Sequence, residues 1–409
     1  MAGPTSPEDA FLEGVKVLDF TQYLAGPSCT RLMAEMGADV IKVEAAPAGD
    51  PTRDRWPARG GRSGVFIQQN RGKRSVAVDL RRPEGRELVL ELVRKVDVVV
   101  ENATPGVMAR RGLGYEDLRA ANPAIIMASI SGFGQYGPYS ERRSFDFVAQ
   151  AMAGLMHMTG EPDGPPYFVG LGVGDVNAGV HAFAGIGYAL FRRDRTGAGC
   201  HLDIAMTDAL FHMHEFAVQA SSLTGDRSLP LRQGRHYQPA APAGTFKAPE
   251  GWIVVLCTQQ QVHALWKAMG RPELAEDERF VDNPSRLEHR AELTELIEAW
   301  MGTFATDAEV IDALAVAGVP AGRVMNPADA VDDPHFQVRR TVREIHDPRA
   351  GSLHVPGFPL RIDGAPVEPT LVAPDLGEHN GAVLGELLGY DEARVGALEE
   401  AGVLVRDGG

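Results

Sequence analysis

The sequence is poor in cysteine and has no long uninterrupted run of apolar residues. Cys29, Cys200 and Cys257 are its three cysteines, and they lie far apart without a metal-binding spacing. A disulfide framework is therefore excluded and a reducing compartment is favoured. No apolar run is long enough to cross a bilayer, and the first fourteen residues do not join a basic region to an apolar one. We expect a cytoplasmic protein without a membrane partner.

Positive charge is also scarce. Forty Lys and Arg residues face 55 Asp and Glu residues, which gives a net charge of -15. Because a phosphate backbone attracts a basic surface, this balance argues against nucleic acid as a partner. The chain has 409 residues, of which 44% are hydrophobic, so it can bury a large core and exceeds the usual size of a single domain.

The first two hundred residues alternate short β-branched runs with helical patterns. The predicted strands are residues 15–19, 39–44, 96–101 and 125–130, and the predicted helices between them are residues 26–36 and 83–95. This alternation predicts an open parallel α/β sheet, with ligands outside the carboxyl ends of its strands.

The composition becomes polar and rich in Pro and Gly around residues 223–242, which predicts a linker. A second unit is expected from Gly244. It contains a strand at 252–257, helices near 259–269, 285–304 and 307–317, and an extended segment at 319–324. A further helix is expected at 392–401 in the tail.

Nine basic residues gather in a short segment of this acidic chain, accompanied only by Asp54 and Asp79. They are Arg53, Arg55, Arg59, Arg62, Arg71, Lys73, Arg74, Arg81 and Arg82. Guanidinium groups suit phosphates, so the segment predicts a local anion site. A solvated basic face that balances acidic neighbours is the alternative.

Asp175 is the candidate for chemistry. It lies in the run Gly174-Asp175-Val176-Asn177, at the start of an apolar stretch that continues to Phe191. A carboxylate in this position is a possible nucleophile. From the local pattern alone, the better interpretation is a helix N-cap that accepts hydrogen bonds from free backbone amides.

Two other motifs are weak. Residues 132–137 match a dinucleotide-binding glycine spacing, but Pro138 and polar residues follow where a helix is required. His212 and His214 lie two residues apart on a predicted helix and point to different faces, so a shared metal is not expected.

Taken in order along nearly the whole chain, several motifs resemble those of the family III CoA-transferases, the group that contains formyl-CoA transferase, carnitine CoA-transferase and the 2-methylacyl-CoA racemases. The motifs are Val17-Leu18-Asp19-Phe20 with Ala25-Gly26-Pro27, residues 37–44, Gly72-Lys73-Arg74-Ser75, Val100-Glu101-Asn102 with Pro105-Gly106, residues 131–138, and residues 203–206 with Asp208-Ala209.

The resemblance implies an open parallel, Rossmann-like α/β domain that binds CoA and is built from both chain ends, residues 1–222 and 335–409. It implies a smaller inserted α+β domain, with its linkers, at residues 223–334. It also implies two chains threaded through each other as an interlocked homodimer.

The same resemblance places Asp175 at the catalytic aspartate of the family. It implies that Asn102, Arg110 and Arg143 bind CoA, with Tyr23, Lys73 and Arg111 as further candidates and Ala25 lining the acyl end. Arg110 and Arg143 as surface ion-pair partners, and Asn102 as a turn residue, are the alternatives. Gly174 is expected to permit close approach of the substrate. Acyl-CoA and a carboxylic acid are the expected substrates, with no tightly bound cofactor and no metal.

Two departures from the family pattern bear on the substrate. Leu24 replaces the glutamine of formyl-CoA transferase, and no glycine-rich loop is found in the small domain, which disfavours formyl-CoA and oxalate. Phe145 stands where the racemases have a catalytic histidine, so one of the two bases for α-proton exchange is missing. We therefore expect a CoA-transferase, with succinyl-CoA as a possible donor. An α-methylacyl-CoA racemase and a non-catalytic nucleotide-binding protein are the alternatives, and the role of Asp146 stays open.

Overall fold

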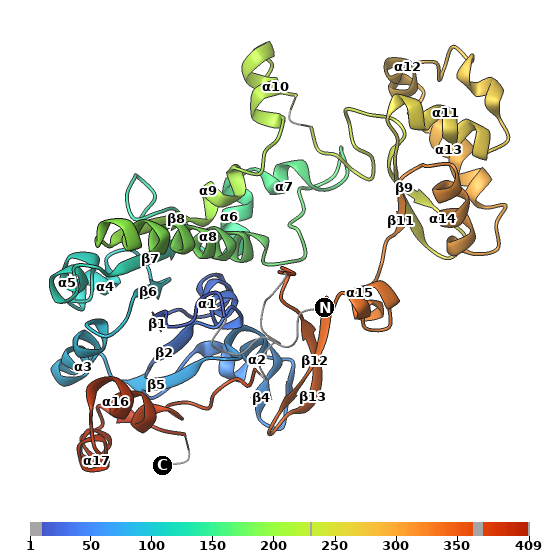
Figure 1. The fold of residues 1–409 in the computed structure, drawn as a ribbon. Coiled ribbons are helices and arrows are strands. Elements are labelled where there is room, and N and C mark those ends of the chain that lie inside the picture. Colours follow the sequence, from blue (N-terminus) through green and yellow to red (C-terminus); the bar gives the residue numbers. More distant parts are fainter. Residues whose placement is uncertain (1–9, 230, 363–370, 408–409) are drawn as a thin grey trace. The chain divides into compact units, whose positions relative to one another are not determined.

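The computed structural model describes residues 10–229, 231–362 and 371–407. The chain forms two compact units (Figure 1). Unit 1 lies within Met1–Ala153, Gly170–His214 and Asp333–Gly409, and unit 2 within Gly154–Val169 and Glu215–Asp332.

Unit 1 is built on a seven-stranded sheet in the order β14-β5-β2-β1-β6-β7-β8. Its strands are β14 (Leu404–Val405), β5 (Arg74–Val78), β2 (Asp39–Ala45), β1 (Lys16–Asp19), β6 (Val98–Glu101), β7 (Ile126–Ser131) and β8 (Cys200–Ala205). The strands are parallel except β14, which pairs antiparallel with β5. From β1 the chain passes outward through β2 to β5 and then returns to β6 on the other side of β1. Parallel sheets bind ligands where the strand order reverses in this way.

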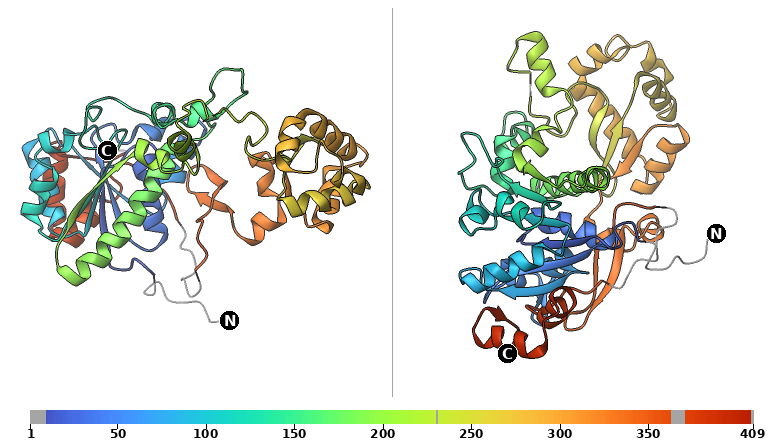
Figure 2. Two further views of the ribbon diagram at one scale, coloured as in Figure 1. Left: turned by 90° about the horizontal axis from the view of Figure 1, so that it is seen from above. Right: turned by 60° about the vertical axis from the view of Figure 1, so that its left-hand side comes forward.

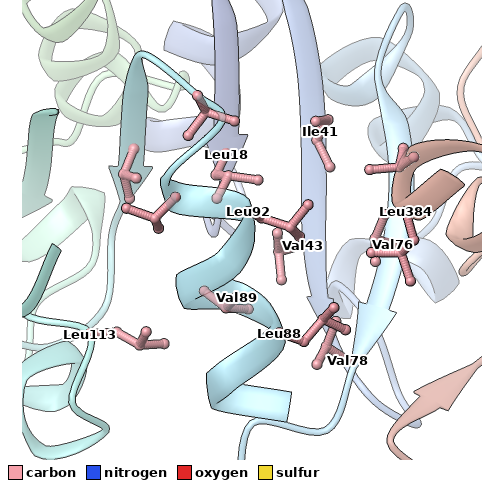
Figure 3. Packing of buried hydrophobic residues seen from close by; sticks show 14 of the residues in the cluster. Leu18, Ile41, Val43, Val76, Val78, Leu88, Val89, Leu92, Leu113 and Leu384 are labelled. Carbon is pink, nitrogen blue, oxygen red and sulfur yellow. The ribbon is translucent and has the colours of Figure 1, made fainter. Parts of the chain in front are cut away.

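Helices cover both faces of this sheet (Figure 2). On one face lie α1 (Ala25–Glu35) and the long α8 (Val173–Thr196), and on the other α3 (Pro83–Val93), α5 (Tyr115–Ala121), α16 (Asn380–Leu388) and α17 (Glu392–Glu400). Figure 3 shows the apolar core beneath α3, where Leu88 and Leu92 pack with Leu18, Ile41 and Val76. Each of these five side chains is at most 3% exposed. Side chains alternate along a strand, so the next residue of each strand points to the opposite face of the sheet. Several of the side chains on that face are charged.

The remaining elements of unit 1 are short. They are η2 (Pro51–Asp54), the pair β3 (Ala58–Arg59) and β4 (Arg62–Ser63), α2 (Gly64–Asn70), α4 (Val107–Arg110), α6 (Asp146–Met152), α9 (Met206–Phe211), α15 (Pro334–Val338) and the hairpin of β12 (Val342–Asp347) with β13 (Gly351–Pro356).

Unit 2 contains an antiparallel sheet with β10 (Trp252–Leu256) between β9 (Ala243–Lys247) and β11 (Ala321–Arg323). Its helical elements are α7 (Leu155–Met158), α10 (Ala217–Thr224), α11 (Gln259–Ala268), η3 (Pro272–Ala275), α12 (Asn283–Glu288), α13 (Arg290–Met301), α14 (Asp307–Val316) and η4 (Pro327–Val331). Trp266, Phe246 and Phe280 are fully buried in its core.

The predicted α/β class with a mainly parallel sheet is confirmed. The expected strands and helices of the first 130 residues lie within two residues of β1, β2, β6, β7, α1 and α3. Strands β5, β8 and β14 were not predicted. A single helix at 285–304 was wrong, because the backbone at His289 leaves the helical region and separates α12 from α13. The predicted linker begins inside α10, and residue 230 lies outside the described residues.

Candidate active site

A cavity of about 420 Å³ opens in unit 1 at the carboxyl ends of β1, β6 and β7, where the strand order reverses. Asp175 lines it together with five of the other residues predicted from the family resemblance: Tyr23, Ala25, Asn102, Arg111 and Arg143. The other lining residues include Gln22, Ala103, Pro105, Ser131, Arg142, Phe145 and Met206. The predicted position of a ligand relative to the sheet therefore coincides with a real cavity.

The loop after β1 forms one wall of the cavity and is held in an unusual conformation. Tyr23 has a backbone φ of 65°, which lies in the left-handed region that residues other than glycine rarely adopt. Asn102, at the end of β6, fixes the loop from the other side. Its Oδ1 accepts a hydrogen bond from the Gln22 amide at 2.9 Å, and its Nδ2 donates to the Gln22 carbonyl at 2.7 Å. Asn102 thus joins two strand ends at the cavity wall.

Lys73 does not line the cavity. Its ammonium group is buried and donates to Asp19 Oδ2 at 2.9 Å, Thr30 Oγ1 at 2.8 Å and Asn70 Oδ1 at 2.9 Å. Burial alone would raise the pKa of Asp19, but Lys73 and Lys42 outweigh it and lower that pKa to about 2. All three donors of Lys73 are engaged in this interior cluster, so none is free to bind CoA, contrary to the prediction.

The basic segment is not a general anion site either, because carboxylates of the chain itself neutralise most of it. Arg53 pairs with Glu44, Arg62 with Asp347 and Asp375, Arg71 with Glu35, Arg74 with Asp39 and Glu386, and Arg81 and Arg82 with Asp79. The charge balance with acidic residues that the alternative proposed is therefore present, but Arg62 and Arg71 are buried, so these residues do not form a solvated face. Sequence alone could not show it, since several of the acidic partners lie about 300 positions away.

A different set of arginines stays available at the cavity. Arg111, Arg142 and Arg143 are exposed and line it, and none forms an ion pair within the described parts of the chain. Arg142 stacks on the Tyr139 ring, with its guanidinium carbon 3.9 Å from the ring centroid. Arg110 is also exposed and unpaired there, but it lies beside Gly106 and outside the cavity lining. Three cations around one cavity favour a polyanionic ligand.

Asp175 lies in the first turn of α8, and its side chain is not a cap. The N-cap residue is Gly172, and the Asp175 carboxylate accepts no hydrogen bond from any residue that the structure describes. Burial, and secondarily the negative charge of Asp146, raise the pKa of Asp175 to about 7. The N-cap interpretation is therefore wrong. A carboxylate that faces a cavity with none of its hydrogen bonds made inside the protein is available to react.

Asp146 does the capping instead. It is buried at the start of α6, and its Oδ1 accepts hydrogen bonds from the amides of Gly174 at 2.6 Å and Asp175 at 3.1 Å. Gln150 donates to its other oxygen and also to the Leu171 carbonyl. A Cβ on Gly174 would lie 2.9 Å from Asp146 Oδ1, so this glycine makes room for Asp146 and not, as expected, for the substrate. Sequence reasoning left the role of Asp146 open because the local sequence does not reveal a contact between residues 28 positions apart.

Apolar side chains surround the reactive end of the cavity. Ala25 begins α1, and Phe145 contacts Tyr23 edge to face at 6.1 Å between ring centroids. Leu24 packs on Gly172, where an added Cβ would lie 2.5 Å from Leu24 Cδ2. Gly172 also lies beside Asp175, so Leu24 contributes to the burial that raises the pKa of Asp175.

The described residues contain no helix that is long and apolar enough to cross a membrane. Within the same residues, no group of three or more His, Cys, Asp or Glu side chains is placed to hold a metal ion.

Comparison with known proteins identifies the family. The model of CoA-transferase family III matches residues 12–380. The chain belongs to this family. It is 37% identical to succinyl-CoA--D-citramalate CoA-transferase of Chloroflexus aurantiacus over 96% of this chain and 98% of that protein. It is 40% identical to succinyl-CoA:mesaconate CoA-transferase of Haloarcula hispanica over 94% of this chain and 97% of that protein.

A solved structure is also similar. The crystal structure of a CAIB/BAIF family protein from Brucella suis superimposes with a TM-score of 0.82 at 37% identity, covering 92% of this chain and 99% of that one. The predicted assignment to the CoA-transferases of family III is therefore confirmed.

Proposed function

We propose that this family III CoA-transferase binds an acyl-CoA in the cavity of unit 1 and moves the CoA through a covalent intermediate on Asp175. The observation that carries the proposal is the Asp175 carboxylate, which lines the cavity without a hydrogen-bond partner among the described residues. The unpaired Arg111, Arg142 and Arg143 around the same cavity support it.

The chemistry proceeds without ATP. One carboxylate oxygen of Asp175 attacks the thioester carbonyl, which forms a mixed anhydride and releases the CoA thiolate. The thiolate then attacks the aspartyl carbonyl, which gives an aspartyl-CoA thioester and frees the first acid. A second acid attacks this thioester and forms a new anhydride with release of the thiolate. Attack of the thiolate on the acyl carbonyl of the second acid yields the new acyl-CoA and restores Asp175. Each step exchanges one activated acyl bond for another.

The residues around the cavity have separate tasks in this proposal. Arg111, Arg142 and Arg143 bind the phosphates, with Arg110 at the periphery, because a guanidinium group matches phosphate oxygens. Asn102 and Tyr23 shape the wall along which the pantetheine arm lies, and Ala25 leaves room for the acyl group. Unit 1 is thus the CoA-binding domain. Leu24 and Phe145 place apolar surface beside the reacting carbonyl.

The proposed donor is succinyl-CoA and the proposed acceptor is a small dicarboxylic acid. The two named relatives, at 37% and 40% identity over nearly the whole chain, transfer CoA from succinyl-CoA to D-citramalate or mesaconate according to their names. Both acceptors carry two carboxyl groups.

A transfer assay with arginine variants tests the CoA site. The wild type is expected to form a new acyl-CoA from succinyl-CoA and a dicarboxylic acid without ATP or added metal. Arg111→Ala and Arg143→Ala should each raise the KM for succinyl-CoA roughly 10-fold or more, because each removes a charge-assisted contact worth about 1.5–3 kcal/mol. Chromatography of the CoA esters measures both.

Arg81→Ala is the matched control, because Arg81 is equally exposed but pairs with Asp79 outside the cavity. If the cavity variants and this control have the same KM for succinyl-CoA, the phosphates bind elsewhere. If the wild type transfers CoA to no carboxylic acid, the proposed function is wrong.

We also propose that the chain acts as an interlocked homodimer in the cytoplasm. Helix α8 exposes an apolar stripe, in which Tyr188 is 75% and Phe191 62% exposed, beside an apolar groove of about 550 Å³ lined by Met33 and Met36. Monomeric proteins rarely expose such a patch. Light scattering should give twice the mass of the 44.0 kDa chain, and Phe191→Glu should lower it. A monomer with full transfer activity would contradict this.

The three free cysteines fit the proposed location in the cytoplasm, which is a reducing compartment.

A further inference from the structure

We infer that Arg55 is the residue that selects dicarboxylic acids, by binding the carboxylate that does not react. The inference rests on the proposed function. While one carboxylate of the acid reacts at Asp175, the other keeps its negative charge. Leu24, Ala25 and Phe145 offer that charge no partner, and an unpaired charge in apolar surroundings is costly. A cation at the reactive end of the cavity would remove this cost.

Arg55 differs from every other basic residue of its segment. The remaining eight each bind a carboxylate or a backbone carbonyl of the chain; Arg59, for example, donates to the carbonyls of Ala350 and Ser352. Within residues 10–229, 231–362 and 371–407, Arg55 has neither an ion pair nor a hydrogen bond through its side chain. It is exposed, and in the described parts of the chain its side chain contacts an aromatic ring, that of Tyr23. A guanidinium group with all its donors free is suited to a carboxylate from outside the protein.

The position of Arg55 is fixed by its neighbours. It follows η2, whose N-cap Asp50 accepts hydrogen bonds from the amide and hydroxyl of Thr52 at 2.9 and 2.8 Å. The other oxygen of Asp50 pairs with the buried Lys42 at 2.9 Å. At the end of η2, Arg53 binds Glu44. Asp50 and Arg53 thus anchor both ends of the short helix to the interior, and the chain that leaves it presents Arg55 in a defined direction.

That direction leads to the cavity. The Arg55 guanidinium carbon lies 5.4 Å from the centroid of the Tyr23 ring. Tyr23 lines the cavity together with Phe145 and Asp175, and its amide contacts Asp50 Oδ1 at 3.5 Å. The same aspartate therefore holds both the Tyr23 loop and the helix that carries Arg55. Arg55 does not itself line the cavity, but its guanidinium lies against the ring of Tyr23, which does, and from there it would reach the remote carboxylate of a small diacid.

The other free arginines are less suited to this role. Arg142 and Arg143 lie on the loop after β7, and the face of Arg142 is occupied by Tyr139. In the proposed function these two residues bind phosphates. If one of them bound the remote carboxylate instead, its replacement and not that of Arg55 would change the preference between diacids and monoacids.

The test compares acceptors within each variant. With butyryl-CoA as the donor, which has no second carboxylate, kcat/KM is measured for succinate and glutarate and for valerate and hexanoate. Arg55→Gln should lower kcat/KM for the diacids roughly 10- to 100-fold, as expected for loss of a hydrogen-bonded charge partner, and leave the monoacids within about 2-fold. Arg55→Lys should recover part of the loss, and Arg81→Gln should have no effect. The ratio of diacid to monoacid does not depend on the folded fraction of a variant.

Three results would overturn the inference. They are an equal loss for both acid classes, no loss for either, or a changed preference in Arg143→Gln but not in Arg55→Gln. A wild type that transfers CoA only to monoacids also overturns it, together with the proposed dicarboxylic acceptor, and leaves the proposed CoA transfer through Asp175 intact. A wild type that transfers CoA to no acid contradicts the proposed function instead, so the two failures are distinguishable.

Discussion

Replacing Asp175 with asparagine is expected to lower the rate of CoA transfer by roughly 10⁴-fold or more, the size of effect that follows loss of a nucleophile. The amide cannot form the mixed anhydride, although it fills the same space. The fold should survive, because the Asp175 carboxylate caps no helix and accepts no hydrogen bond from the described residues. Transfer is measured by chromatography of the CoA esters, and circular dichroism checks the fold.

A chemical trap gives an independent readout. Wild type incubated with acyl-CoA alone and quenched with hydroxylamine should carry a hydroxamate on the peptide that contains Asp175, because only an activated aspartyl carbonyl reacts in this way. Asp208→Asn is the control, since Asp208 also lies in the first turn of a helix but is exposed and outside the cavity lining. Near wild-type transfer by a folded Asp175→Asn protein, or a label on another residue, would rule out the covalent mechanism.

The parts of the fold that the sequence predicts are those with strong local periodicity. Strands such as β1 and β6 are runs of buried residues, and α3 begins with Pro83 and has Glu84 in its first turn. Strand β5 was missed because it lies inside the basic segment, where Arg74 and Ser75 hide the apolar residues that follow. Strand β14 has two residues, and only its pairing with β5 defines it.

The residue types of the candidate site could likewise be predicted from the sequence, whereas their contacts could not. The motifs that resemble the family pointed to Asp175, Asn102, Arg111 and Arg143, which line the cavity, whereas Arg142 lines it without having been predicted. The contacts of these residues depend on residues far away in sequence. Lys73 was predicted to bind CoA, but Asp19, 54 positions away, neutralises it. Arg55 is one of nine basic residues that look equivalent in the sequence, and the structure shows that the other eight have partners within the protein. Local sequence records the type of a side chain, whereas its availability depends on tertiary partners.

The second large effect concerns the pH dependence and Asp146. The pKa of Asp175 is raised to about 7, first by burial and then by Asp146. Because the nucleophile must be ionised, the wild-type transfer rate should rise with pH, about 10-fold per unit below 7, and level off above it. Asp146→Asn removes the charge but keeps an oxygen that can accept from the Gly174 and Asp175 amides. Asp146→Asn should therefore shift the rising part of the rate–pH profile to lower pH. It should leave the rate at pH 8 within a few-fold of wild type.

Asp146→Ala should behave differently, since it removes the acceptor as well as the charge. Two buried amides at the start of α8 lose their partner, which costs roughly 1–3 kcal/mol each at most and lowers the melting temperature by several degrees. Asp175 also loses its fixed orientation, so the rate at pH 8 should fall roughly 10²-fold, as for a misplaced reacting group.

Rates from pH 5 to 9 and thermal melting separate the two variants. If Asp146→Asn leaves the pH limb where it is in the wild type, the charge of Asp146 does not act on the nucleophile. If Asp146→Ala keeps the wild-type rate at pH 8, the capping of α8 does not position Asp175, and burial alone governs its reactivity.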